Sequence, residues 1–200
     1  MLAEASRLNP GPWTDHCLHV AEAASAIATR HPDLDPDTAY IYGCLHDIGR
    51  RFGVMQMRHI VEGHRFLEGL GNSKPARICL THSFPVKDTR SCVAEWDCED
   101  EDRAFVQSYL EEINYDDYDR LLQLCDGIAL PHGCVLIEKR LVDVVLRYER
   151  LSGGSMADHL RDQGIDGRND WWIHLWRSAE CGGEHLSVTR LRRRLRRAGQ

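Results

Sequence analysis

Apolar positions recur at helical spacing along most of the chain. Between residues 13 and 28, Val20, Ala21, Ala24 and Ile27 fall on one face, as expected for a helix that packs against a core. No segment keeps a strand-like alternation of apolar and polar residues for long. The spacing therefore predicts an all-α protein, and its first helix is expected over about Trp13–Ala28.

Capping residues and prolines bound the helices that follow. Asp35-Pro36 is an N-cap followed by proline at the first helical position, so a second helix is expected from there to about Asp47. Pro85 disfavours helix at the residue before it, which limits the fourth helix. That fourth helix is expected to start near Ser73 and to end by Phe84. The other later helices are expected over about Met57–Leu70, Glu101–Ile113, Asp116–Leu130 and Val135–Leu151.

A linker signal, Ser152-Gly153-Gly154-Ser155, divides the chain. We predict a core domain over residues 1–151 and a C-terminal extension over residues 152–200. The extension contains a tryptophan-rich segment, Trp171–Trp176, and an arginine-rich tail, Arg190–Arg197. The tryptophans are too apolar to form a patch in water, so we expect them to pack on the core or across a homodimer interface.

Composition and charge narrow the class of protein. The chain has 200 residues, of which 42% are hydrophobic and 28% charged, as in ordinary soluble domains. The formal charge of −6 argues against nucleic acid as the main partner. The arginine-rich tail could bind RNA, anionic lipid or a neighbouring subunit, but a solvated terminal helix is favoured. Likewise, the acidic run over residues 95–119 is interpreted as a solvated face rather than a docking site.

Cysteine usage and hydropathy suggest a compartment. None of the eight cysteines forms a CxxC pair, and several fall inside helical segments, so we expect reduced core thiols. The first residues lack the pattern of a secretory signal, and no apolar stretch approaches the roughly 20 residues that span a bilayer. We therefore expect a cytoplasmic protein that does not interact with membranes.

Histidines and aspartates within apolar segments are the candidate functional residues. Asp47 and Asp126 lie among leucine, isoleucine and cysteine, where an unpaired carboxylate is costly. A bound dication would offset that cost, because imidazoles and carboxylates are its natural ligands. Neighbouring helical side chains diverge by about 100°, so His46 and Asp47 can share one ion only near a helix end, or can bind two ions. Spacing alone leaves ordinary buried histidines as an equal alternative.

The order of these residues resembles the HD-domain phosphohydrolases over about residues 10–150. LHDIGR resembles the family's LHDIGK signature, with Arg50 in place of the usual lysine, and HIVEGHRFL resembles its H-P-x-x-G-x-x-L element. THS at His82 and CDGI at Asp126 are most similar to stretches of the bacterial symmetrical diadenosine tetraphosphatases. After His82, however, Ser83-Phe84-Pro85 stands in place of Thr-Ser-Gly.

The resemblance implies a helical bundle with a central metal site. By analogy, the first ion would be held by His16, His46, Asp47 and Asp126. Asp47 would bridge to a second ion, which His59 and His82 would complete, although His64 is an alternative to His59. One or two ions, divalent or mixed-valence, are expected, with iron favoured and manganese, zinc or nickel as alternatives.

The resemblance also implies an activity, metal-dependent hydrolysis of a phosphoanhydride or phosphoester in a nucleotide-like small molecule. Asp47 and Arg50 are the expected catalytic residues. The candidates for phosphate binding are Arg50, Arg51, Ser83 and Lys87, with Arg77 as a weaker one. A dinucleoside polyphosphate leads, ahead of nucleoside mono- or triphosphates, whereas cyclic dinucleotides are disfavoured because a GYP sequence is missing. The alternative is an HD module that senses a nucleotide without turnover.

Overall fold

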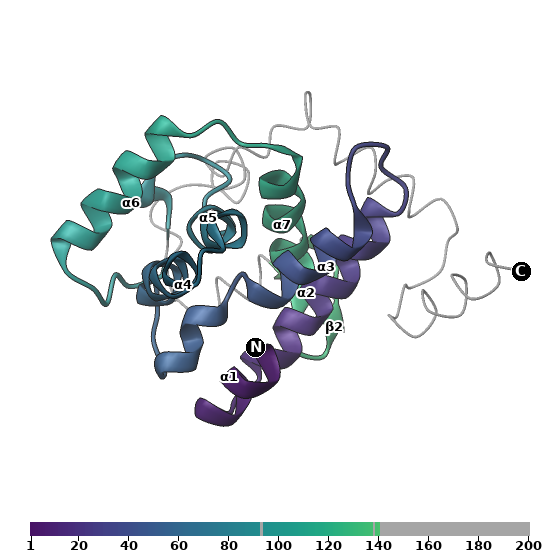
Figure 1. Cartoon of the computed structure of the whole chain (residues 1–200), viewed down its shortest axis with the longest axis horizontal. Coiled ribbons are helices and arrows are strands. Elements are labelled where there is room, and N and C mark those ends of the chain that lie inside the picture. The colour runs from purple at the N-terminus through teal and green to yellow at the C-terminus, as the bar shows by residue number, and fades with distance from the viewer. Residues whose placement is uncertain (93, 138, 141–200) are drawn as a thin grey trace, which may run out of the picture.

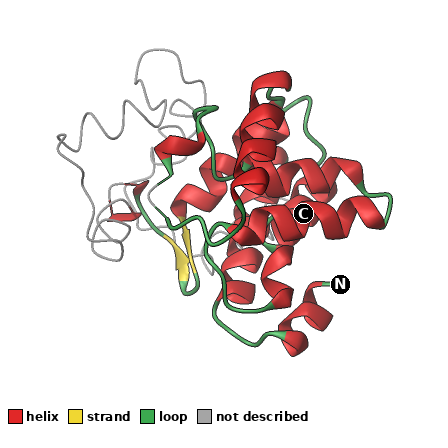
Figure 2. Cartoon of the chain, turned by 90° about the vertical axis from the view of Figure 1, so that its left-hand side faces the viewer, coloured by secondary structure: helices red, strands yellow, loops and turns green. Residues whose placement is uncertain are grey.

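Seven α-helices dominate the part of the chain that the computed structural model describes, which is residues 1–92, 94–137 and 139–140. In chain order, the elements are α1 (Leu2–Leu8), α2 (Trp13–Ala28), α3 (Pro36–Leu45), the 3₁₀ helix η1 (Ile48–Phe52), α4 (Arg58–Gly69), α5 (Ser73–Thr81), the 3₁₀ helix η2 (Thr89–Ser91), α6 (Asp100–Glu112), α7 (Asp117–Ile128), β1 (Ala129–Leu130) and β2 (Gly133–Cys134). The two strands form a small antiparallel hairpin beside the helices (Figure 2). The prediction of an all-α fold is confirmed.

Helix α5 lies at the centre of the bundle, with α4, α6 and α7 around it (Figure 1). Its buried residues contribute to three separate apolar clusters. Ile78 packs with residues of α2, α3 and α7, Leu80 with residues of α4 and α6, and Cys79 with residues of α1, η1 and α4. The core therefore surrounds α5, and the helix ends beside it converge on its C-terminal turn.

Two glycines allow close approaches of backbone that bring distant segments together. A Cβ atom at Gly43 would lie 2.4 Å from the Cα of Ala21, and one at Gly49 would lie 2.0 Å from the carbonyl oxygen of His59. Real Cβ atoms do not come that close, so only glycine permits these contacts. As a result, α3 lies against α2, and η1 lies against α4.

Several helix ends differ from the sequence prediction. Asp35 caps α3 as expected, accepting a hydrogen bond from the Thr38 amide at 2.7 Å, but α3 ends at Leu45 rather than near Asp47. Helix α5 ends at Thr81, within the limit at Phe84 that Pro85 sets. Periodicity does not resolve the last turn of a helix. The short helix α1 and the two-residue strands were not predicted, because neither is long enough to show a period.

The acidic run is not uniformly solvated, which corrects the sequence interpretation. Asp119 is fully buried, accepts hydrogen bonds from Arg77 and from Thr81 Oγ1, and completes a capping box with Asp116 at the start of α7. Asp97 also has partners, the amides of residues 56 and 58. These carboxylates therefore stabilise α4 and α7, which a count of charges does not reveal.

Other predictions concern thiols, membranes and the C-terminal region. The cysteines at positions 17, 44, 79, 92, 98, 125 and 134 are free, as expected for reduced thiols. None of the helices in the described ranges has the length and apolar character to cross a membrane. Several predictions lie outside the described residues. They are the linker, the tryptophan-rich segment, the arginine-rich tail, the domain boundary at 151 and most of the expected helix over 135–151.

Candidate metal centre

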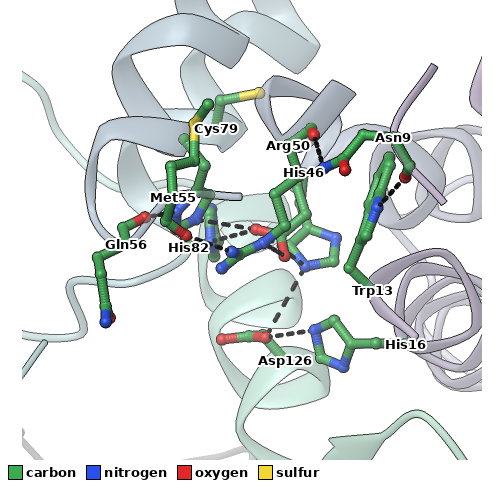
Figure 3. Close-up of polar contacts among 12 residues, drawn as sticks. Asn9, Trp13, His16, His46, Arg50, Met55, Gln56, Cys79, His82 and Asp126 are labelled. Carbon is green, nitrogen blue, oxygen red and sulfur yellow. Dashed lines mark hydrogen bonds and ion pairs between the residues drawn. The ribbon is translucent and has the colours of Figure 1, made fainter. Parts of the chain in front are cut away.

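Six side chains named from the sequence come together beside the C-terminal end of α5. Figure 3 labels four of them, His16, His46, His82 and Asp126. Each lies at or near the end of a helix: His16 in the first turn of α2, His46 at the C-cap of α3, Asp47 before η1, His59 in the first turn of α4, His82 at the C-cap of α5, and Asp126 in the last turn of α7. Because side chains at helix ends can converge without helix backbone between them, the ends of α3 and α5 help to form the cluster.

The first trio consists of His16, His46 and Asp126. Nε2 of His16 lies 2.9 Å from Oδ1 of Asp126, and Nε2 of His46 lies 3.8 Å from the same oxygen. The imidazole rings of His16 and His46 meet edge to face, with centroids 5.2 Å apart. Three potential ligand atoms therefore face a common point.

The second trio consists of Asp47, His59 and His82. Oδ1 of Asp47 lies 2.9 Å from Nε2 of His59 and 3.5 Å from Nε2 of His82. The same oxygen lies 3.8 Å from Nε2 of His46, which belongs to the first trio. The two trios are thus adjacent, and His46 and Asp47 join them.

Backbone carbonyls orient three of the four imidazoles. Nδ1 of His46 is 2.8 Å from the Gly43 carbonyl oxygen, and Nδ1 of His82 is 3.0 Å from that of Ile78. Nδ1 of His59 contacts the carbonyl oxygen of Gln56. A carbonyl can only accept, so in each case Nδ1 carries the proton and Nε2 is turned toward the carboxylates. Metal-ligating histidines are usually oriented in this way.

The inward nitrogens fit a bound cation. Nε2 of His46 and Nε2 of His59 are buried without a hydrogen-bond partner among the described residues. In a neutral ring whose Nδ1 donates, Nε2 carries a lone pair, and here it faces the oxygens of Asp47 and Asp126. A cation between them would satisfy both the lone pairs and the carboxylates. Four imidazoles and two carboxylates form a donor set that suits a divalent transition metal.

The protonation states also favour metal ligation. Burial lowers the pKa of His46 to about 4 and lowers that of His59, which keeps these imidazoles neutral, as ligands must be. Burial alone would raise the pKa of Asp47, but Arg50, His59 and His46 outweigh it and hold that pKa well below the usual range. His82 differs: burial lowers its pKa, but the contacts with Asp47, the charge of Asp126 and the Ile78 carbonyl together outweigh burial and raise its pKa.

Arg50 lies against the second trio. Its Nε donates to Oδ2 of Asp47 at 2.6 Å, and its Nη1 donates to the Met55 carbonyl at 2.9 Å. Asn9 Nδ2 donates to the carbonyl of Arg50 itself at 2.6 Å. The side chain remains 28% exposed. Arg50 can therefore hold Asp47 in place and still present a guanidinium at the edge of the cluster.

The other predicted phosphate-binding cations have partners elsewhere. Arg51 lies 3.4 Å from Glu4 and over the ring of Phe66. Lys87 donates to the carbonyl of Ile113, and Arg77 pairs with Asp119. Ser83 directly follows His82 and is half-buried. Of the predicted phosphate-binding cations, only Arg50 has a recorded contact with the six-residue cluster among the described residues.

Two alternatives raised by the sequence can be compared directly. Nε2 of His59 lies beside Asp47, whereas Nδ1 of His64 lies 3.2 Å from the carbonyl oxygen of Ala76, and its ring packs near Phe105. The structure thus places His59, and not His64, in the cluster. His19 was interpreted from the sequence as lying outside the site. Its Nδ1 lies 3.6 Å from Oε2 of Glu22.

Sequence reasoning missed one potential ligand, the thiol of Cys17. Cys17, His46 and Asp47 form a third group whose ligand atoms lie within 4.8 Å of one another. Cys17 is fully buried, and burial together with the charge of Asp47 raises its pKa well above the ordinary value. Its position next to His16 was the one available signal, and a cysteine within a buried helix is usually a packing residue.

Comparison with known proteins identifies the family. The sequence model described as HD domain matches residues 13–130, a range that includes all six clustered side chains. The chain therefore belongs to the HD domain family, whose members are in general metal-dependent phosphohydrolases. No curated protein and no solved structure matches the chain.

Proposed function

We propose that this protein is a phosphohydrolase that cleaves a phosphoanhydride or phosphoester of a nucleotide-like small molecule. The observation that carries the proposal is the pair of adjacent trios joined by His46 and Asp47. Two neighbouring ions, when bound, can activate water and stabilise the charge that develops on phosphate oxygens. Membership of the HD domain family supports the same class of reaction.

Different residues of the site would bind the ions and the phosphate. His16, His46 and Asp126 would hold one ion, and His59 and His82 the other, with Asp47 between them. Arg50 would contact a phosphate oxygen through its partly exposed guanidinium, whose geometry matches that of phosphate. Its hydrogen bond to Asp47 would hold the guanidinium at a fixed position relative to that carboxylate. The bound phosphate would then be held at a fixed position relative to the ions.

Within this class, we favour a dinucleoside polyphosphate as substrate. The support is the similarity of the sequences around His82 and Asp126 to the symmetrical diadenosine tetraphosphatases. The departure after His82 has a packing role in this chain. Phe84 is fully buried and stacks against Trp96, so the Ser83-Phe84-Pro85 sequence adds a core anchor where the tetraphosphatases have Thr-Ser-Gly.

Metal analysis and a substrate panel test the proposal. We expect the purified full chain to contain a transition metal, and to hydrolyse diadenosine tetraphosphate faster than nucleoside mono- and triphosphates and cyclic dinucleotides. The assay is run after reconstitution with iron, manganese, zinc or nickel. His16→Ala should lower both metal content and hydrolysis. His19→Ala, three residues along the same helix, is the matched control and should change neither.

Two outcomes would contradict the proposal in different ways. Wild-type protein that binds none of the four metals would remove the basis for any hydrolysis at this site. Protein that binds metal and nucleotides but releases no product from any of them would instead be a nucleotide-sensing HD module.

A further inference from the structure

The N-terminal end of helix α4 is capped by residues that lie about forty positions later in the chain. Met57, at the N-cap, makes no side-chain capping hydrogen bond. Instead, Oδ2 of Asp97 accepts from the Gln56 amide at 2.8 Å, and Oδ1 accepts from the Arg58 amide at 2.8 Å. The Glu95 carbonyl accepts from the amide of Met57 at 3.1 Å. Three consecutive amides are thus bound by one loop.

The capped segment orients two side chains of the candidate metal centre. The carbonyl of Gln56 accepts from Nδ1 of His59, and the carbonyl of Met55 accepts from Arg50 at 2.9 Å. His59 and Arg50 each contact Asp47. A continuous series of contacts therefore runs from Asp97 through the backbone of residues 55–58 to the carboxylate that joins the two trios.

Trp96 holds the capping loop in place. Its ring stacks on Phe84 with centroids 6.1 Å apart, as part of the apolar cluster that also includes Met57. The guanidinium of Arg103 lies 5.4 Å from the centre of the Trp96 ring. Because Trp96 lies between Glu95 and Asp97, its packing against this cluster holds both of the groups that accept from α4.

We infer that Asp97 is a positioning residue of the metal centre, which acts by holding the peptides of residues 56–58 so that His59 and Arg50 meet Asp47. The inference rests on the proposed function for its consequence in metal binding. Groups that orient a ligand in this way typically change metal affinity when they are removed. Of the two trios, only the second contains His59, and Asp47 is shared with the first through His46, so we expect the larger effect on the ion beside His59.

The first test uses the metal-free full chain and the variants Asp97→Ala, Asp97→Asn and Asp88→Ala. Asp88 is the matched control, because its carboxylate accepts from the amide of Arg90 in the same connection without touching α4. Hydrogen exchange is measured at the amides of Gln56 and Arg58, and the tautomer of His59 is read by nitrogen NMR. Asp97→Ala should speed exchange at these amides about tenfold, and His59 should lose its single Nδ1-protonated form.

The second test is a titration of the same proteins with cobalt(II), followed by visible absorption. Asp97→Ala should weaken one of two binding steps about tenfold and weaken the other much less. Asp97→Asn retains one acceptor oxygen, so its effect should fall between those of Asp97→Ala and the wild type. Asp88→Ala should titrate as the wild type does.

Specific results would overturn the inference. The amide exchange, the His59 tautomer and the cobalt affinity of Asp97→Ala could all equal those of Asp88→Ala. That result would show that Asp97 does not position the metal centre. Equal weakening of both binding steps would show a general loss of structure. Wild-type protein that binds no cobalt would defeat the proposed function, and the exchange and tautomer measurements would still decide whether Asp97 positions His59.

Discussion

Each of His46, His59 and His82 donates Nδ1–H to a backbone carbonyl three or four residues earlier, and this contact decides which nitrogen faces the carboxylates. The fourth histidine, His16, contacts Asp126 through Nε2. All four imidazoles thus present Nε2 to an aspartate. Each of these ligands therefore depends on the position of one nitrogen atom. Single substitutions should distinguish the residues that bind metal from neighbouring residues that do not.

His59 and His64 offer the sharpest comparison, because they lie on the same helix and only one of them meets Asp47. His59→Ala should lower metal content and reduce hydrolysis more than about 100-fold, since removal of a ligand should exceed the usual effect of a supporting group. His64→Ala removes a ring that packs near Phe105 and Tyr109, and should lower stability without loss of metal. Elemental analysis and steady-state kinetics of both variants check this. Loss of metal in His64→Ala but not in His59→Ala would make His64 the ligand in place of His59.

Arg50 contacts both a potential ligand and the edge of the site, so its charge and its shape can be tested separately. Arg50→Lys keeps the charge but loses the fork that holds Asp47 and phosphate. We expect metal content to stay near that of the wild type while KM rises about tenfold, which is about 1.4 kcal/mol of binding. Arg50→Ala should also lower metal content, because Asp47 loses its partner.

The control for Arg50 is Arg51→Lys, since Arg51 lies next in sequence but contacts Glu4 and Phe66. KM in this variant should equal that of the wild type. A tenfold rise would return Arg51 to the phosphate-binding set, as the sequence first suggested.

At the scale of elements, the site depends on how closely helices approach. Gly43→Ala would place Cβ 2.4 Å from backbone of Ala21, which should force α3 away from α2 and destabilise the fold by about 3 kcal/mol. His16 and His46 would then separate, so metal affinity should fall as well. Gly69→Ala is the control, because a Cβ there meets nothing within 4 Å and alanine should add about 0.5 kcal/mol. Urea unfolding measures both, and equal stabilities would contradict the close-approach argument.

The sequence predicted most elements because their apolar stripes and caps are local signals. Helix α2 occupies the predicted range, and Asp35 caps α3 as expected. The capping of α4 by Asp97 could not be predicted, because the donor amides and the accepting carboxylate lie about forty residues apart. For the same reason, the acidic run gave no sign that Asp119 is buried with Arg77.

Much of the candidate site was visible in the sequence for a different reason. Histidine and aspartate are conspicuous within apolar segments, so the six clustered residues could be named without coordinates. Their mutual distances depend on where helices end, and α3 ends earlier than periodicity indicates. The partners of Arg51 and Lys87 depend on packing between distant elements, which residue patterns do not report.

At the scale of the whole molecule, the six side chains come from α2, α4 and α7 and from the residues that follow α3 and α5. Ions bound by both trios would link these five helices. Anything that binds only the folded state stabilises it, by about 2.7 kcal/mol at a free concentration of 100 times Kd. In a chain of this size, that free energy corresponds to about 5–10 °C in the unfolding midpoint.

Chelation should therefore lower the thermal midpoint of the full chain by about 5–10 °C, and readdition of metal should restore it. Asp47→Asn removes the carboxylate charge that faces His46, His59 and His82, so its midpoint should no longer respond to chelator. Scanning calorimetry of both proteins, with and without metal, measures the difference. If the wild type unfolds at the same temperature in both conditions while metal analysis shows it loaded, the ions do not join the helices as the two trios require.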